Sequence, residues 1–304
     1  MALSLRIFSS DSSLRPGLAC EITPEGVIAA RQTAADQAVM AFAPLTPGAV
    51  QPGLAAANFR DQTSIVAALR SALDEVAQRE KQLTLVVPDA AVRVLILDFD
   101  SLPSKAQEAM PIVRFRLRKL APFEVDDAAV SYQIMRHEQN QTRVLVTVMP
   151  AEIRAEYEGV ARAAGYEPGV ILPSMLASLA ALRSTDAALV VNRNGLSLTT
   201  AITNGDELLL HRTLELPASA SAQREEVAQA VSVTSAYFED TIHASPSVLY
   251  YAGPGGAEAF VAMLGVETQD GLRMVHDLVP AAAPGAVSAM PKGLAAGVTG
   301  ALAS

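Results

Sequence analysis

The sequence predicts an α/β protein in which one plan of secondary structure occurs twice. Three strand-like runs, a helix-like segment and a further strand lie between residues 17 and 87, and the same order returns between residues 187 and 251. Half of the 304 residues are hydrophobic, which is enough to bury two cores of ordinary size. A parallel sheet with helices on its faces is the natural package for this order of elements.

The first half begins with a run of three strands. A Pro-Glu-Gly turn separates the first two strands, and Ile65, Leu69 and Leu73 recur at helical spacing after the third. The predicted elements are a strand or loose tail at Leu3–Phe8, strands at Gly17–Thr23, Val27–Thr33 and Val39–Ala43, a helix at Asp61–Glu80 and a strand at Leu83–Val87. This order is the opening of a ribonuclease H-like domain.

A second group of elements follows. Its helix has an apolar face of Ala109, Ile112, Val113, Leu117 and Leu120, and Pro111 is expected to kink or restart it. The predicted elements are a strand at Ala91–Phe99, a helix at Lys105–Leu120 capped by Ser101 or Ser104, a hairpin of Val130–His137 and Thr142–Met149, a helix at Ala151–Ala164 ending at Gly165, a strand at Gly169–Leu172 and a helix at Ser174–Arg183.

The second half repeats the opening plan, with Asn-Gly dipeptides as its two hairpin turns. The predicted elements are strands at Ala187–Asn192, Leu196–Thr203 and Glu207–Leu214, a helix at Glu225–His243, a strand at Ser247–Tyr251, a helix at Ala257–Leu264, an Ala/Pro-rich connection at Leu278–Pro291 and a helix at Gly293–Leu302. We expect a first domain at 1–174, with an inserted subdomain at about 102–148 and completed by 290–304, and a second domain at 175–289.

Composition excludes several classes of function. The net charge of −9 disfavours a nucleic-acid partner. Cys20 is the only cysteine, so an intramolecular disulfide and a cysteine-cluster metal site are excluded, and a reducing compartment fits. No run approaches the ~20 apolar residues of a membrane helix, and the N-terminus lacks the pattern of a signal peptide. We therefore expect a cytoplasmic protein.

The stretch from Leu83 to Tyr132 is the most specific part of the sequence. Its segments VPD (87–89), DFDSLP (98–103), RFRLRK (114–119) and PFEVDDAAVSY (122–132) resemble the matching segments of the PilM family, the cytoplasmic actin-like component of the type IV pilus assembly platform. The cytoplasmic part of GspL, from type II secretion, and FtsA are relatives. The duplicated plan is that of the actin-like ATPase fold, with two ribonuclease H-like domains.

The resemblance implies a partner and a place. A PilM-like protein binds the short cytoplasmic N-terminal peptide of a bitopic inner-membrane partner, PilN, and contacts the pilus motor ATPases. It is peripheral at the inner membrane through these partners. The family's peptide groove lies between the first domain and the inserted subdomain. The partner-binding candidates here are Arg114, Arg118, Lys119, Pro122 and Phe123.

The resemblance also implies a nucleotide site, and the sequence departs from it. The first phosphate hairpin, normally Asp-Ile-Gly-Ser/Thr, is here Glu21, Ile22, Thr23 and Pro24, followed by Glu25, which brings negative charge. The glycine that lets backbone N–H groups approach phosphate is missing, and proline removes a donor.

The second hairpin also departs from its pattern, Asp-Ile-Gly-Gly. It reads Asn192, Arg193, Asn194 and Gly195, so the metal-binding carboxylate is lost. The adenosine-loop glycines Gly253, Gly255 and Gly256 remain. ATP with Mg²⁺ is the family's cofactor, but we expect no ATP hydrolysis and weak or no nucleotide binding. Gly253, Gly255 and Gly256 also have a structural interpretation, as helix-start packing.

Other candidates have plain structural interpretations. The basic run at 114–119 is a docking face for a partner or a membrane leaflet, or a solvated helix end that offsets the helix dipole. Pro122-Phe123 lines a groove or forms a corner. Asp98 and Asp100 form a turn rather than a metal pair, and the four histidines lack a ligand spacing.

Three classes of function remain. The first is a non-enzymatic scaffold that binds a membrane protein's cytoplasmic tail, by β-augmentation or groove capture. The second is an actin-fold ATPase or phosphotransferase, which needs the carboxylates that the hairpins lack. The third is a polymerising cytoskeletal protein, which needs nucleotide and an amphipathic C-terminal helix; GLAAGVTGALAS carries no basic amphipathic face. The sequence favours the scaffold.

Overall fold

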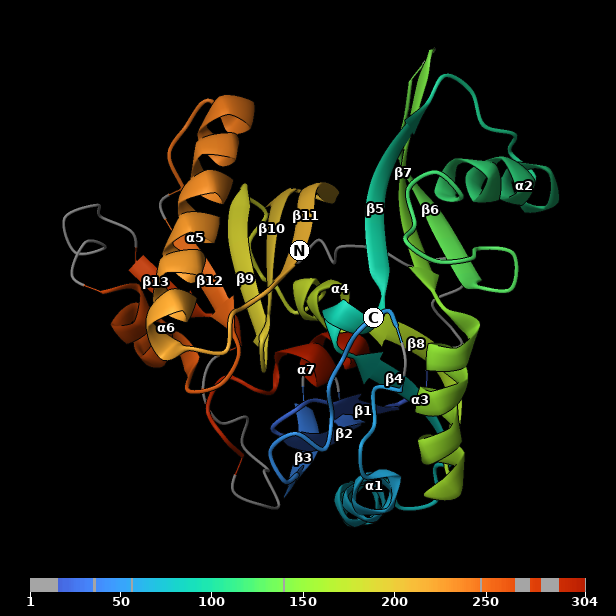
Figure 1. Cartoon of the computed structure of the whole chain (residues 1–304), viewed down its shortest axis with the longest axis vertical. Coiled ribbons are helices and arrows are strands. Elements are labelled where there is room, and N and C mark those ends of the chain that lie inside the picture. The colour runs from blue at the N-terminus through green and yellow to red at the C-terminus, as the bar shows by residue number, and fades with distance from the viewer. Residues whose placement is uncertain are drawn as a thin grey trace.

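The structure is a computed structural model that describes residues 16–34, 37–55, 57–138, 140–246, 248–265, 274–279 and 290–303. These residues form two five-stranded sheets and one three-stranded sheet (Figure 1). We call the parts built on them the first lobe, the second lobe and the inserted lobe. The predicted strand or tail at Leu3–Phe8 lies outside the described residues.

The first lobe has the sheet order β3-β2-β1-β4-β8. Its strands are β1 (Leu18–Ile22), β2 (Gly26–Ala34), β3 (Gln37–Pro44), β4 (Gln82–Val87) and β8 (Glu167–Pro173), and its helices are α1 (Gln62–Val76), α3 (Ala151–Ala163), α4 (Ser174–Leu179) and α7 (Ala296–Leu302). β1 pairs antiparallel with β2 and parallel with β4, so the strand order is that of a ribonuclease H-like sheet.

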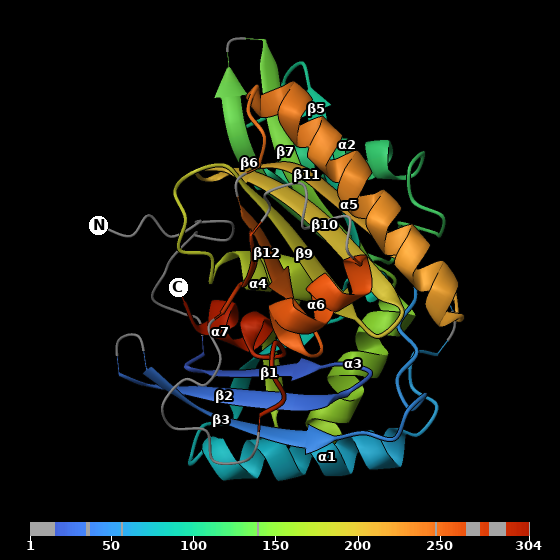
Figure 2. The same ribbon diagram turned by 90° about the vertical axis from the view of Figure 1, so that its left-hand side faces the viewer.

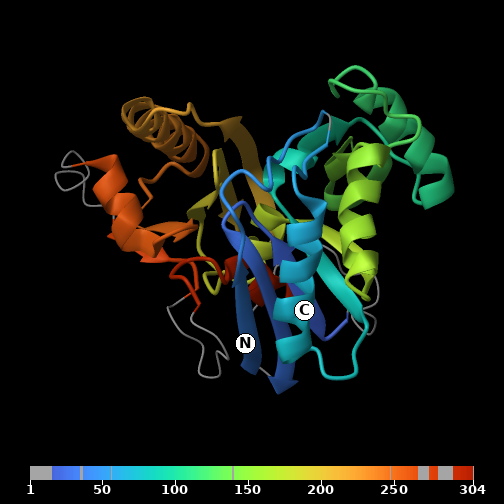
Figure 3. The same ribbon diagram turned by 60° about the horizontal axis from the view of Figure 1, so that its bottom comes forward.

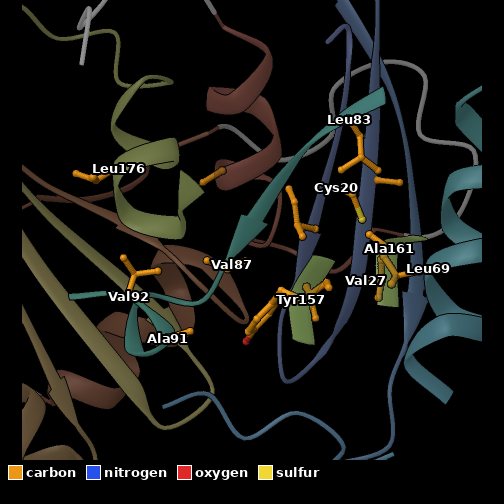
Figure 4. Close-up of a cluster of buried hydrophobic side chains, with 14 of the residues drawn as sticks. Cys20, Val27, Leu69, Leu83, Val87, Ala91, Val92, Tyr157, Ala161 and Leu176 are labelled. Atoms are coloured by element: carbon orange, nitrogen blue, oxygen red, sulfur yellow. The ribbon is translucent and has the colours of Figure 1, made fainter. Parts of the chain in front are cut away.

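Helices cover both faces of this sheet. α1 runs under β2 and β3 and contacts α3 (Figure 2), while α4 and α7 pack together on the opposite face. Cys20 and Leu83 point from the sheet into the core, where they meet Leu69 of α1 and Ala161 of α3 (Figure 4). The C-terminal helix α7 returns to β1, β2 and β4 and completes the first lobe.

The inserted lobe leaves the first lobe after β4. A short 3₁₀ turn (Asp89–Ala91) leads into β5 (Arg93–Phe99), which is followed by α2 (Ala106–Leu117), β6 (Ala129–Glu138) and β7 (Gln141–Met149), in the sheet order β5-β7-β6. Ala109, Val113 and Leu117 of α2 are buried with Val144 and Val146 of β7 in a core of their own.

The second lobe repeats the first, with sheet order β11-β10-β9-β12-β13. Its elements are β9 (Ala188–Asn194), β10 (Ser197–Asn204), β11 (Glu207–Glu215), α5 (Ala220–Ile242), β12 (Val248–Ala252), α6 (Gly256–Leu264) and β13 (Met274–Asp277). α5 and α6 lie on the side of the molecule away from α2 (Figures 1 and 3). The guanidinium of Arg143 on β7 pairs with Asp98 of β5 at 3.0 Å and with Glu207 of β11 at 3.2 Å, which links the inserted lobe to the second lobe.

The inserted lobe differs from its prediction in three ways. β5 pairs along its length with β7, so this lobe takes in residues before the expected start at 102. α2 begins after Lys105, and neither Ser101 nor Ser104 caps it. Ile112 and Leu120, predicted on its buried face, are 40% and 43% exposed. The helix is one continuous segment across Pro111.

The bounds of other helices also differ from the predicted ones. α1 is capped by Asp61 as expected, but it ends before Gln78, whose φ of +54° is left-handed. α4 ends at Leu179 rather than at 183. α5 begins at Ala220, five residues before its predicted start, because Ser219 accepts a hydrogen bond from the N–H of Ala222. β13 lies just before the stretch predicted as connection and was not foreseen.

Candidate functional site

A buried polar cluster joins the first lobe to the second. Glu21 lies at the end of β1, Asp89 just after β4, Ser174 at the start of α4, and Asn192 and Asn194 at the end of β9; all five are buried. The ends of β1 and β4, which are parallel neighbours in the first sheet, and of β9 in the second sheet bring them together. The carboxyl ends of strands are where α/β sheets place their ligand sites.

Hydrogen bonds connect these side chains across the lobes. The amide Nδ2 of Asn192 donates to Oδ2 of Asp89 and to Oγ of Ser174, both at 3.0 Å. Ser174 Oγ donates in turn to Oε1 of Glu21 at 2.6 Å, and the backbone N–H of Met175 donates to Oδ1 of Asp89 at 2.9 Å. Asn192, which stands where a carboxylate was expected, thus donates directly to Asp89 and reaches Glu21 only through Ser174.

Burial controls the charge of this cluster. It raises the pKa of Glu21 to about 8, although the hydrogen bond from Ser174 opposes the rise, and it raises the pKa of Asp89 to about 6. Glu21 is therefore mostly protonated at neutral pH. Its Oε2 is buried without a hydrogen-bond partner among the described residues, and Gly297 of α7 packs directly against it.

In all three segments that were compared with nucleotide-binding motifs, backbone or side-chain groups make hydrogen bonds to other residues of the chain. The first hairpin is closed in this way. The Oγ1 of Thr23 donates to the carbonyl of Gly26 at 2.9 Å and accepts from its N–H at 3.1 Å, which closes the turn between β1 and β2. Beside it, Glu25 Oε1 accepts from the backbone N–H of Gly195 in the second hairpin at 3.1 Å.

The adenosine-loop glycines also have partners from the chain. The N–H groups of Gly253 and Gly255 donate to the carbonyls of Gly293 and Lys292. Ala257 follows these glycines in the first turn of α6, and its N–H donates to Oδ1 of Asp277 at 2.6 Å. The sequence did not point to Asp277, because β13 was not predicted. Gly253 and Gly255 were predicted as helix-start packing or as a nucleotide loop, and in the structure their backbones bond to residues 292–293.

The predicted partner-binding residues gather in the inserted lobe, but they differ in exposure. The guanidinium of Arg114 donates to the carbonyls of Val125, Asp126 and Ala128, so this arginine holds the loop after α2. Arg118 is exposed and pairs with the carboxylate of Asp126 at 2.7 Å. These contacts give Arg114 a structural role that the sequence did not reveal.

The remaining candidates follow Arg118 along the chain, and one of them lies against an exposed aromatic residue. The ammonium of Lys119 lies 5.4 Å from the ring centroid of Phe115, Pro122 is exposed, and Phe123 packs partly buried on the inserted lobe's core. Phe115 is 61% exposed and was not a candidate. Its only signal in the sequence was its position outside the apolar stripe of α2.

An open groove runs beside Phe115 on α2. Its lining residues are Gln107, Met110, Pro111, Arg114, Phe115 and Arg118. The groove combines an apolar floor with two guanidinium groups at its rim. This is the chemistry that an acidic segment with apolar anchors would fit.

The described residues contain no group of three or more metal-ligating side chains. Within the same residues, no helix has both the length and the apolar character needed to cross a bilayer.

Comparison with known proteins gives structural matches only. No protein-family model matches the sequence, and no curated protein matches it significantly. A chain of the PilM–PilN type IV pilus biogenesis complex matches with a TM-score of 0.70 and 18% identity, over 86% of this chain and 88% of that chain.

Two further solved structures match at lower TM-scores. The cytoplasmic domain of EpsL, an inner membrane component of the type II secretion system of Vibrio cholerae, gives 0.50 with 12% identity over 94% and 92% of the two chains. The ethanolamine utilization protein EutJ from Carboxydothermus hydrogenoformans gives 0.50 with 10% identity over 95% and 90%. The chain therefore has the actin-like fold that its duplicated plan predicts, and the expected resemblance to PilM is confirmed at the level of structure.

Proposed function

We propose that this chain is a non-enzymatic scaffold of type IV pilus biogenesis. It binds the cytoplasmic N-terminal peptide of a PilN-like inner-membrane protein and links that protein to the pilus motor, so that it works in the cytoplasm at the inner membrane. The observation that supports this role most is the structural match to a chain of the PilM–PilN complex over most of both chains.

The interlobe cluster supports the absence of catalysis. Phosphoryl transfer needs metal-holding carboxylates and free backbone donors around phosphate. Here Asn192 is an amide, Glu21 is sealed under α7, and the N–H of Gly195 already has a carboxylate partner. Calorimetry with Mg-ATP is expected to show no binding and no phosphate release. Micromolar binding with phosphate release would favour the other candidate function, an actin-fold ATPase or phosphotransferase.

We assign the peptide to the groove on α2. Among the large hydrophobic side chains that the structure describes, Phe115 is the most exposed. Aromatic side chains flanked by arginine are the usual anchors of interfaces. Arg118 and Lys119 stand beside it and favour a peptide that carries acidic residues. The predicted residues Arg118 and Lys119 thus belong to one surface with Phe115.

The test is titration of the intact protein with a synthetic peptide covering the N-terminal segment of the PilN-like protein from the same genome. Phe115→Ala is expected to weaken binding about tenfold or more. Tyr237→Ala is the matched control, because Tyr237 is an aromatic residue with 43% exposure in α5, a helix on the side of the molecule away from α2 (Figure 3). Equal affinity of both variants and the wild type would remove this groove from the proposal.

A charge reversal tests the rim of the same groove. Arg118→Glu is expected to weaken binding, whereas Arg224→Glu, at an exposed position of α5, leaves it unchanged. Arg114→Glu is unsuitable as a test of binding, because it also releases the three carbonyls that Arg114 holds. A wild type that binds no peptide at all would contradict the scaffold proposal itself.

A further inference from the structure

The turn between β1 and β2 contacts the turn between β9 and β10. Oε1 of Glu25 accepts a hydrogen bond from the backbone N–H of Gly195 at 3.1 Å. Gly195 has a φ of +58°, and a Cβ at this position would lie 2.8 Å from Cγ of Pro24. The two turns therefore pack against each other, with the carboxylate of one on the N–H of the other.

The contact is not needed to close either turn. The Thr23 and Gly26 hydrogen bonds close the first turn within itself. The N–H of Leu45 donates to the carbonyl of Glu25 at 3.2 Å, which fixes the backbone from which the carboxylate reaches across. The side chain of Glu25 thus spans the lobes as a separate connection.

Arg193 and Glu25 both lie close enough to the phenol of Tyr251 to interact with it electrostatically. The side chain of Arg193 lies on the same hairpin, where its Nε donates to the carbonyl of Gly195 at 3.1 Å. Burial raises the pKa of Tyr251 to about 12; the charge of Arg193 opposes this rise and the charge of Glu25 adds to it, so both groups lie within electrostatic reach of the phenol. Oε2 of Glu25 is buried and lacks a hydrogen-bond partner among the described residues.

We propose that Glu25 is an internal substitute for phosphate. In actin-like folds these two hairpins hold the phosphates of a nucleotide, and a backbone N–H in a glycine turn binds carboxylate and phosphate oxygens by the same chemistry. Glu25 occupies the N–H of the second hairpin and joins the two lobes without a ligand. The proposal goes beyond the scaffold function, because it holds whether or not the groove on α2 binds a peptide.

The test is amide hydrogen exchange of Gly195, measured by NMR on the full chain. Glu25→Ala removes the acceptor, so the amide of Gly195 is expected to exchange at least ten times faster than in the wild type. Gly205, in the next hairpin turn with a φ of +57° and open space around it, is the internal reference and is expected to keep its rate. An unchanged rate at Gly195 would overturn the proposal.

Rescue with added anions separates phosphate mimicry from simple packing. Inorganic pyrophosphate or formate is expected to slow the exchange of Gly195 again in Glu25→Ala and to leave the wild type unaffected. Fast exchange that neither anion slows would show that the space left by Glu25 binds no oxyanion, and would overturn the proposal.

A second variant keeps the test available if Glu25→Ala does not fold. Glu25→Gln retains an oxygen acceptor without charge, so its Gly195 amide is expected to exchange faster than in the wild type but more slowly than in the alanine variant. If Glu25→Ala cannot be measured and the Gly195 amide of Glu25→Gln exchanges at the wild-type rate, the part of the proposal that requires a charge on residue 25 would be overturned. The peptide titration is an independent measurement, so its failure leaves the result at Gly195 standing.

Discussion

At the scale of single residues, the acidic side chains between the lobes differ from those of an exposed surface. Glu21 is buried under Gly297 and has one carboxyl oxygen bonded to Ser174 and one without a partner among the described residues. Its pKa is raised to about 8 by burial, from an ordinary value of 4.5. The folded protein therefore keeps a proton on Glu21 that the unfolded chain has released at neutral pH.

This difference makes stability depend on pH. Between about pH 4.5 and pH 8 the folded state binds more protons than the unfolded state, so the free energy of unfolding falls as the pH rises through this window. Glu21→Gln keeps an acceptor for Ser174 and has no charge to release. We expect its advantage over the wild type to be roughly 3–4 kcal/mol larger at pH 8 than at pH 5.

Urea unfolding of the two proteins at pH 5, 6.5 and 8 measures this effect. Glu75→Gln, at an exposed position of α1, is the control and is expected to follow the wild type at each pH. A stability difference for Glu21→Gln that stays constant with pH would show that Glu21 is already ionised in the folded protein.

At the scale of elements, α7 depends on having no side chain where it meets its neighbours. A Cβ on Gly300 would overlap the carbonyl oxygen of Ala177 in α4, and a Cβ on Gly297 would overlap the carboxyl of Glu21. Backbone rather than a flexible side chain is the obstacle at Gly300, so α7 would have to move away from α4. The close packing of this helix is thus what seals the interlobe cluster.

The same substitution is expected to have opposite effects on two helices. Gly300→Ala should destabilise the protein by about 2 kcal/mol or more because of this overlap. Gly159→Ala lies on the exposed face of α3 with nothing near its Cβ position, so it should stabilise the protein by about 0.5–1 kcal/mol through the better helix propensity of alanine. Thermal unfolding of both variants measures the difference, and a neutral Gly300→Ala would mean that α7 is not tightly packed on α4.

Elements with a strong local pattern were predictable from the sequence. Asp61 was predicted as the start of α1, and the Asn-Gly turns located the hairpins of β9, β10 and β11. β5 could not be assigned to a sheet, because an apolar run such as VLILDF does not say which neighbour it pairs with. The start of α2 was predicted to within one residue, but its capping residue was not, because the helix follows Lys105, which makes no side-chain cap.

The sequence indicated which residues form the candidate site better than it indicated the hydrogen bonds that these residues make. Glu21, Thr23, Asn192 and Gly195 were picked out by the family's pattern, and the structure brings them to the junction of the lobes. Asp89 was not predicted as a site residue. Its hydrogen-bond partners, Met175 and Asn192, lie far away in the sequence, so no local pattern indicated these contacts.

At the scale of the whole molecule, two of the contacts that connect the second lobe to the rest differ in their burial. Arg143 and Glu207 link it to the inserted lobe at the surface, where ion pairs contribute little to stability. The buried hydrogen bonds of Asn192 link it to the first lobe, and a buried polar group that loses its partners costs far more. We therefore expect Asn192 and its neighbours to contribute more to the relative placement of the lobes than the pair of Arg143 and Glu207 does.

Asn192→Asp tests this dependence and the loss of the metal site together. An ionised aspartate cannot donate to Asp89 and adds a third carboxyl beside it and Glu21, so we expect the free energy of unfolding to fall by about 3 kcal/mol at pH 8. The loss should shrink at pH 5, where protonation restores a donor and removes the charge. Asn204→Asp, at the exposed end of β10, should have little effect at either pH. Added Mg²⁺ should not restore the stability of Asn192→Asp, because Glu21 is sealed beneath α7. Recovery with Mg²⁺ at pH 8 would show that the cluster can still hold a metal ion once a carboxylate stands at position 192, and would contradict the sealing of Glu21.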